Sequence, residues 1–198
     1  MPAPAAATPG AKQRTTALGI LSGGRGSRYG GLDKGWIQVD GVAQIQRVLR
    51  ALAGSVDRVM VSANRHLDAY RELGVDVIKD RWPDHPGPFA GVASLFSALK
   101  EDALLTVPVD VQRLPDDFTS RLYASVGPER FHIVVAEDDD GLQPLFALYP
   151  GALAANAIEN FEVGKRSVRE WQHRFPIYVC RFAGHRFGNL NSPGDATA

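Results

Sequence analysis

The sequence predicts a single-domain α/β protein with a mostly parallel central sheet and helices on both faces. Short apolar runs alternate with segments whose apolar residues recur at helical spacing, which is typical of βαβ units. A glycine-rich stretch follows directly after the first apolar run. With 198 residues, of which 44% are apolar and 22% charged, the chain has the length and composition of one globular domain.

The first half of the chain contains the clearest alternation of strands and helices. An apolar run at 16–21 stops at a polar, glycine-rich segment, as expected of a strand that ends in a loop. Ile45, Val48 and Leu52 recur at helical spacing and predict an amphipathic helix ending at Gly54. The elements expected here are a strand at 16–21, a brief strand at 36–39, a helix at 45–54, a strand at 56–61, a helix at 67–73 and a strand at 75–78.

The second half predicts a sheet that is not wholly parallel. Strand-like segments at 131–136 and 144–149 flank a turn-forming run at 138–141, which indicates an antiparallel hairpin. The other expected elements are a helix at 89–99, a strand at 104–107, helices at 151–161 and 168–173, and a strand at 177–182. We therefore expect one domain over 16–198, preceded by a disordered, proline-rich tail at 1–15.

Charge and cysteine content exclude several classes of partner. Lys plus Arg and Asp plus Glu each total 22, so no overall field favours nucleic acid or an anionic membrane. No stretch approaches the about 18 apolar residues that a membrane-spanning helix needs, and the tail lacks the apolar run of a signal peptide. The single cysteine, Cys180, fits a reducing compartment. We expect a cytoplasmic protein that binds neither nucleic acid nor membrane.

The glycine-rich loop from Gly23 to Lys34 does not match two common nucleotide-binding patterns. A dinucleotide fingerprint needs a glycine where this chain has Tyr29, and an acidic residue at the end of the second strand, where Ser62 and its neighbours stand. A P-loop needs serine or threonine after its lysine, but Lys34 is followed by Gly35. Neither a nicotinamide cofactor nor a P-loop nucleotide is therefore expected.

The loop still has the composition of a triphosphate site. It combines backbone amides with three cations, Arg25, Arg28 and Lys34, at the carboxyl edge of the expected sheet. On glycine content alone, a mobile surface loop with solvated basic residues is about equally compatible with the sequence. The composition alone leaves these two interpretations open.

Several segments together resemble the molybdenum cofactor guanylyltransferases, a family of the nucleotidyltransferase superfamily. The matching segments are LSGGRGSRYGGLDKG at 21–35, VSANRH at 61–66, DHPGPFAG at 84–91, the strand end at Asp110, GKRSV at 164–168 and FGNLNSP at 187–193. They occur in the family's order and cover nearly the whole chain after the tail. The resemblance implies a Rossmann-like nucleotidyltransferase fold and transfer of GMP from GTP to molybdopterin, or its molybdenum-bound form, with release of pyrophosphate.

The resemblance also assigns roles to individual residues. It implies that the loop and strand ends hold the guanine nucleotide, that Arg28, Lys34 and Asp110 are catalytic, and that Asp110 binds the cofactor Mg²⁺. Glycines after the third strand would let the backbone approach a ligand, and two asparagines near the end of the chain would place the pterin. The residues expected to bind nucleotide, metal or pterin are Leu21, Ser22, Gly23, Gly24, Lys34, Asn64, Asp80, Gly87, Gly91, Asp110, Asn189 and Asn191.

This chain departs from the family at a few positions. Alanine is usual where Ser22 stands, methionine where Tyr29 stands, and a proline usually follows soon after the metal-binding aspartate, where this chain has Val111 and Gln112. None of these changes removes a charge that phosphate chemistry needs. For the isolated residues, turn capping by Asp80 or Asp110 remains the simpler alternative.

Other functions remain compatible with these observations. A molybdopterin cytidylyltransferase shares the fold and much of the loop, and a sugar-phosphate nucleotidyltransferase is a more distant enzyme alternative. A nucleotide- or cofactor-binding module without turnover is a different class. The resemblance further implies a molybdenum-insertion protein and recipient molybdoenzymes as partners.

Overall fold

The computed structural model describes residues 14–23, 33–82, 87–126 and 132–190. In chain order its elements are β1 (Thr16–Leu21), the 3-10 turn η2 (Lys34–Trp36), β2 (Gln38–Val39), β3 (Val42–Ala43), α1 (Gln44–Leu52), η3 (Ala53–Ser55), β4 (Arg58–Ser62), α2 (Leu67–Arg71), β5 (Asp76–Ile78), α3 (Pro88–Ala98), β6 (Ala103–Pro108), α4 (Phe118–Ala124), β7 (Ile133–Asp138), β8 (Gly141–Pro150), η4 (Gly151–Leu153), α5 (Ala154–Glu162), α6 (Val168–Gln172) and β9 (Ile177–Arg181).

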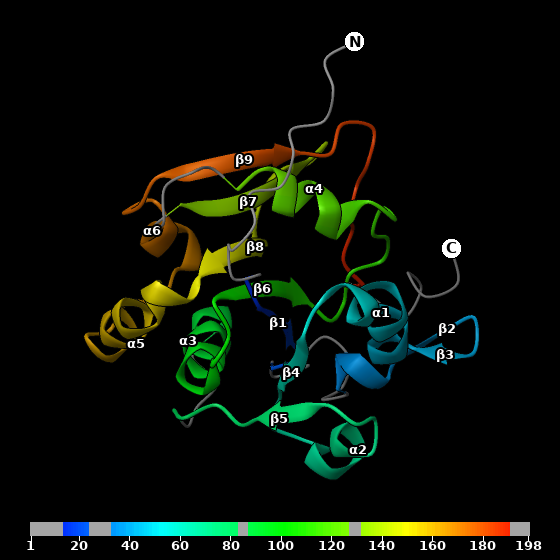
Figure 1. Ribbon diagram of the computed structural model, residues 1–198. Coiled ribbons are helices and arrows are strands. Elements are labelled where there is room, and N and C mark those ends of the chain that lie inside the picture. Colours follow the sequence, from blue (N-terminus) through cyan, green and yellow to red (C-terminus); the bar gives the residue numbers. More distant parts are fainter. Residues whose placement is uncertain (1–13, 24–32, 83–86, 127–131, 191–198) are drawn as a thin grey trace.

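A seven-stranded sheet divides the molecule, with strands in the order β5-β4-β1-β6-β8-β7-β9. Figure 1 shows this sheet between two groups of helices, with α3, α5 and α6 on one side and α1 and α4 on the other. β1 pairs in parallel with both β4 and β6, whereas β8 is antiparallel to both of its neighbours. The expected mixed, mostly parallel α/β sheet is confirmed.

The strand β1 is almost wholly apolar because both of its faces are covered. All six residues are buried, and alternate side chains enter different cores. Leu18 and Ile20 pack with α1, α2 and α4, whereas Ala17 and Leu21 pack with α3, α5 and α6. Gly19 allows close packing of α3, because a Cβ there would lie 2.7 Å from a methyl carbon of Leu95.

The antiparallel part of the sheet is a hairpin. β7 and β8 meet at a turn in which Gly141 has φ +106°, a conformation that favours glycine. The buried carboxylate of Asp138 accepts hydrogen bonds from the Asp140 amide and the Gln143 side chain, which fixes the turn. The predicted hairpin is thus confirmed around the acidic run, and its first strand is described from Ile133 onwards.

Three details of the sequence prediction change in the structure. The brief strand expected at 36–39 is in part the 3-10 turn η2, and the second parallel strand begins at Arg58 rather than Val56, which follows η3. α4 was not expected, because its seven residues are too few for a clear periodic pattern and its N-cap makes no side-chain hydrogen bond. Residues 1–13 lie outside the described residues, so the domain boundary stays a prediction. None of the described helices is long and apolar enough to cross a membrane.

Although short, α4 contributes the ring of Phe118 to an aromatic cluster in the core. The ring of Phe118 contacts the rings of Phe146, Phe182 and Phe187, with centroids 5.4–6.1 Å apart. We expect Phe118→Ala to lower the free energy of unfolding by about 3–5 kcal/mol, because it leaves a cavity among these rings. Urea denaturation measures this loss. Val163→Ala is the control, because that side chain is 70% exposed. An equal loss of stability in both variants would contradict the role of Phe118 in the aromatic core.

Candidate nucleotide-binding site

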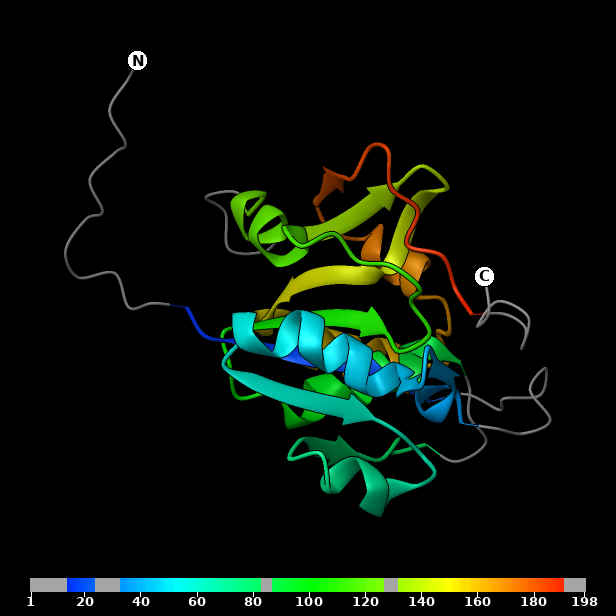
Figure 2. The same ribbon diagram turned by 90° about the vertical axis from the view of Figure 1, so that its right-hand side faces the viewer.

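A pocket of about 220 Å³ lies at the carboxyl ends of the parallel strands. Figure 2 shows β4 and β6 directed toward the same edge of the sheet, where the turn η2 also lies. The lining residues come from the ends of β1, β4 and β6, from η2, from the start of α3 and from β8. They are Leu21, Ser22, Gly23, Lys34, Ser62, Asp80, Gly87, Pro88, Gly91, Pro108, Val109, Asp110 and Leu145. Eight of the residues predicted from the sequence therefore lie around one pocket.

Lys34 and Asp110 form an ion pair at the wall of this pocket. The Lys34 Nζ atom lies 2.5 Å from Oδ2 of Asp110, and the two side chains are 33% and 16% exposed. Lys34 belongs to η2, whereas Asp110 follows β6, so the pair joins segments that are 76 residues apart. A cation and a hard carboxylate thus meet where both can still reach a ligand in the pocket.

Asp80 is held in place by two side chains from the end of β4. Its Oδ1 accepts a hydrogen bond from the Ser62 hydroxyl at 2.9 Å, and its Oδ2 accepts one from the Asn64 amide at 2.7 Å. The Asn64 side-chain oxygen in turn accepts a bond from the Asp80 main-chain amide. Gly23 approaches this group, because a Cβ there would lie 3.5 Å from Oδ2 of Asp80. The carboxylate is thereby fixed at the pocket wall.

A second buried carboxylate, Asp33, precedes Lys34. Its Oδ1 accepts hydrogen bonds from the Gly35 amide at 3.0 Å and the Tyr70 hydroxyl at 2.8 Å. The Ser22 hydroxyl oxygen lies 2.6 Å from the Tyr70 oxygen, to which it donates its one proton, and 3.3 Å from the same Oδ1. Burial, opposed in part by the hydrogen bond from Ser22, raises the pKa of Tyr70, and the negative charge of Asp33 raises it further. The phenol is therefore a hydrogen-bond donor at neutral pH.

The two predicted glycines at the start of α3 have different environments. Gly87 is the N-cap of α3 and has φ +97°, with nothing near the position of a Cβ. Gly91 lies one turn into the helix, where a Cβ would be 2.9 Å from both Leu21 Cδ2 and Ser62 Oγ. Packing of α3 against the ends of β1 and β4 thus accounts for Gly91. A backbone contact of either glycine with a ligand stays a prediction.

Asn189 is tied to the loop that carries Asp110. Val111 and Asn189 form an antiparallel bridge, and the Leu190 amide donates a hydrogen bond to the Asp110 carbonyl at 2.9 Å. The Gln112 amide donates to the Phe187 carbonyl at 3.1 Å, a bond that proline could not make. Asn189, predicted to place the pterin, and Asp110, predicted to bind the metal, therefore lie on two backbone segments that are hydrogen-bonded to each other.

Three predicted site residues, Gly24, Arg28 and Asn191, lie outside the described residues, as does Arg25. Asp110 provides the kind of oxygen ligand that Mg²⁺ prefers, since carboxylate oxygen is a hard donor. Among the described residues, no group of three or more His, Cys, Asp or Glu side chains is arranged around a common point. The residue type and place of Asp110 fit a cation that takes its other ligands from phosphate and water.

A larger depression of about 930 Å³ lies at the opposite end of the sheet. Its carboxylates hold the start of β1, since Asp57 accepts a bond from the Thr16 amide and Asp102 accepts one from the Thr15 amide. Size alone does not indicate function, and the pairing of Lys34 with Asp110 lies in the smaller pocket. We therefore assign the site to the carboxyl edge of the sheet.

Sequence reasoning missed three residues of the site: Ser62, Asp33 and Tyr70. Ser62 ends β4 and lines the pocket, a position that the strand prediction alone could have indicated. Asp33 directly precedes the predicted Lys34, but loop aspartates more often fix turns. Nothing in the sequence links Tyr70 to the loop, because their contact depends on how α2 packs.

Comparison with known proteins supplies a family. A sequence model described as the MobA-like NTP transferase domain matches residues 18–175. A molybdenum cofactor guanylyltransferase of Burkholderia orbicola is 37% identical over 183 residues, covering 87% of this chain and 89% of its own length. One of Shewanella frigidimarina is 34% identical over 176 residues, covering 88% of this chain and 90% of its own length. The crystal structure of molybdopterin-guanine dinucleotide biosynthesis protein A from Archaeoglobus fulgidus shares the fold, with a TM-score of 0.70 at 18% identity over 91% of this chain and 94% of that protein.

The close packing at Gly91 gives a prediction about the pocket wall. We expect Gly91→Ala to lower the free energy of unfolding by about 1–3 kcal/mol, because the added methyl group displaces Leu21 and Ser62. Gly54→Ala is the matched control, since a Cβ at Gly54 meets nothing within 4 Å. Urea denaturation of both variants measures the difference. Equal stability of the two variants would show that the wall accommodates the methyl group.

Proposed function

The chain belongs to the MobA-like NTP transferase family and, within it, to the molybdenum cofactor guanylyltransferases, and from this premise we propose that it transfers GMP from GTP to molybdopterin. The acceptor includes the molybdenum-bound form of the pterin. The observation that carries the proposal is the pairing of Lys34 with Asp110 at the edge of the pocket. A triphosphate with its cation needs a positive and a negative group close together at one place.

The reaction needs alignment more than it needs a strong base. An oxygen of the terminal phosphate of molybdopterin attacks the α-phosphorus of GTP, and the bond from that phosphorus to the oxygen bridging to the β-phosphate breaks. Pyrophosphate leaves with the electron pair of that bond. The attacking phosphate is already ionised at neutral pH, so the protein must align two anions and offset their repulsion. Lys34 supplies positive charge at the pocket, and we propose Arg28 for the same role.

The other residues of the pocket are proposed to hold the nucleotide. Guanine presents N–H donors, for which the fixed carboxylate of Asp80 is a suitable acceptor. Asn64 keeps that carboxylate oriented. The chain segment from Leu21 to Gly23 forms the adjoining wall, with Gly24 continuing it, and Gly87 and Gly91 lie at the start of α3 opposite. Asn189 and Asn191 are proposed to place the pterin beside Asp110.

We propose Mg²⁺ as the cofactor, held by Asp110. When bound, the cation neutralises negative charge on the triphosphate. Asp110 follows β6 and is tied through its carbonyl to Leu190, so its carboxylate is kept at the mouth of the pocket. Lys34 pairs with the same carboxylate and lines the same pocket, and we propose that it exchanges that contact for a phosphate oxygen when GTP binds.

The neighbouring activities are separated by their substrates. A cytidylyltransferase would consume CTP with the same pterin, and a sugar-phosphate nucleotidyltransferase would use a different acceptor. A binding module would hold GTP without consuming it. A cytoplasmic site of action, and contact with a molybdenum-insertion protein and recipient molybdoenzymes, are part of the same proposal and accord with a cofactor that must be passed on.

The ion pair gives the most direct mutational test of the proposal. We expect Lys34→Ala and Asp110→Ala each to lower the rate of GMP transfer by about 100- to 1,000-fold, because each removes a charge from the site of phosphate chemistry. The measurement is pyrophosphate release with GTP, Mg²⁺ and molybdopterin. Circular dichroism should show both variants to be folded.

The control for these variants is another ion pair. Asp68→Ala removes a carboxylate that is 90% exposed, is paired with Arg71 and does not line the pocket. This variant should retain normal transfer. Normal turnover by folded Lys34→Ala protein would refute the assignment of the site.

Metal binding can be tested without turnover. Mn²⁺ is a spectroscopically visible substitute for Mg²⁺, and its binding in the presence of GTP can be followed by electron paramagnetic resonance. We expect Asp110→Asn to weaken Mn²⁺ binding by at least about tenfold, because the amide that replaces the carboxylate is uncharged. Asp68→Asn should leave it unchanged. Equal affinity in the Asp110→Asn and unaltered proteins would remove Asp110 from the metal site.

A further inference from the structure

Three side chains from separate segments meet next to Lys34. Ser22 follows β1, Asp33 precedes η2, and Tyr70 lies on α2. The Ser22 hydroxyl donates to the Tyr70 oxygen at 2.6 Å, and the Tyr70 hydroxyl donates to Oδ1 of Asp33 at 2.8 Å. The Ser22 oxygen also lies 3.3 Å from that Oδ1. We call these three residues the Asp33 clamp. Ser22 and Asp33 stand on either side of the segment 24–32, so the clamp joins the chain before that segment to the chain after it.

Two of the three residues of the clamp are buried, and Ser22 is partly buried. Asp33 is 5% exposed and Tyr70 is 0% exposed. A carboxylate in such a place needs hydrogen-bond donors, because burial otherwise opposes its charge. The donors to Asp33 are the Tyr70 hydroxyl and the Gly35 amide, and the Ser22 hydroxyl supports the first of them by donating to the Tyr70 oxygen. Removing one hydroxyl therefore weakens the fixation of Asp33 while leaving the hydrophobic packing largely in place.

The clamp reaches both neighbours of Lys34. Asp33 accepts from the Gly35 amide, which closes η2 around Lys34. A Cβ at Gly35 would lie 2.2 Å from the Tyr70 hydroxyl oxygen and 3.0 Å from the Ser22 hydroxyl oxygen. Both hydroxyls therefore pack closely against the backbone of Gly35. The backbone of Lys34 is thus fixed on each side, and its ammonium group extends to Asp110.

We propose that Tyr70 is a positioning residue that, through Asp33 and Gly35, holds Lys34 where its ammonium group meets the triphosphate. This inference rests on the proposed function. Ser22 adds a second hydroxyl to the clamp, next to the Tyr70 oxygen. Tyr70 does not itself touch the pocket, since the pocket lining includes Ser22 and Lys34 but not Tyr70.

Tyr70 also packs as an aromatic ring, and the test must separate that role from the role of its hydroxyl. Its ring centroid lies 5.1 Å from that of Trp36, and the ring belongs to the core on the α1 side of the sheet. Tyr70→Phe keeps the ring and removes only the oxygen. A purely structural contribution would change the stability of the protein but would not depend on whether Lys34 is present.

The experiment is a double-mutant cycle on GTP binding by the full chain, with Mg²⁺ and without pterin. Isothermal titration calorimetry gives the dissociation constant for the unaltered protein, Tyr70→Phe, Lys34→Ala and the double variant. We expect Tyr70→Phe to weaken GTP binding roughly five- to tenfold, as for loss of a hydrogen bond to a buried charged group. In the Lys34→Ala background the same change should have less than about a twofold effect, because the positioned group is gone. Ser22→Ala should show a smaller loss with the same dependence on Lys34.

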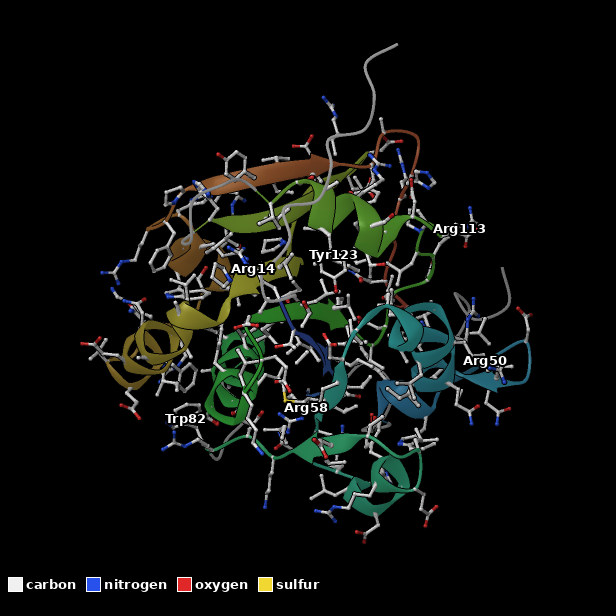
Figure 3. The ribbon with its side chains drawn as sticks, viewed as in Figure 1. Arg14, Arg50, Arg58, Trp82, Arg113 and Tyr123 are labelled. Carbon is white, nitrogen blue, oxygen red and sulfur yellow. The ribbon has the colours of Figure 1, made fainter. Side chains whose placement is uncertain are left out.

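Tyr123→Phe is the matched control. Tyr123 lies on α4, well away from α2 in Figure 3. Its hydroxyl donates a hydrogen bond to the Ser55 carbonyl at 3.1 Å. This variant should bind GTP like the unaltered protein. Unchanged GTP binding by Tyr70→Phe, or an equal loss with and without Lys34, would overturn the inference while leaving the proposed function intact. Failure of the unaltered protein to bind GTP would overturn both.

Discussion

Parallel pairing of β1 with β4 and β6 is the constraint on which the site depends. In that register Leu21 pairs with Ser62 on one side and with Pro108 on the other, so three strands end at the same level. The segments that follow these strands therefore start at the same edge of the sheet. This brings Ser22, Asn64 and Asp110 together from distant parts of the sequence. Hydrogen bonds continue this alignment beyond the strands, from the Ser22 amide to Ser62 and from the Val109 amide to Leu21.

The carboxylates of Asp33 and Asp110, one buried and one partly buried, have different environments at this edge of the sheet. Asp33 is surrounded by donors and cannot turn to a ligand without losing them, which suits a structural anchor. Asp110 pairs with one flexible ammonium group and remains partly exposed, which suits a group that changes partners. Both carboxylates are next to Lys34: Asp33 precedes it in the sequence, and Asp110 contacts its ammonium group from another segment. Rigidity on one side of Lys34 and exchangeability on the other are what phosphate transfer requires.

The sequence alone predicted most of this arrangement, for identifiable reasons. β1 and β6 were predictable because strands covered on both faces are mostly apolar, and the hairpin because its acidic turn ends in Gly141. The pocket residues followed from their places at strand ends and from family resemblance. Asp33 and Tyr70 could not be found in this way, because their contact is set by the packing of α2 next to Asp33. The role of Gly91 likewise became clear only from the distance between α3 and the ends of β1 and β4.

The central claim is that this edge of the sheet holds GTP for transfer of GMP to a pterin phosphate. The most direct measurement is anaerobic turnover of the Mg²⁺-supplied protein with molybdenum-charged molybdopterin, following pyrophosphate release with GTP and, separately, with CTP. We expect pyrophosphate release that depends on both GTP and the pterin, with little release from CTP. Preference for CTP would assign the protein to cytidylyl transfer, and no release with either nucleotide would contradict the account.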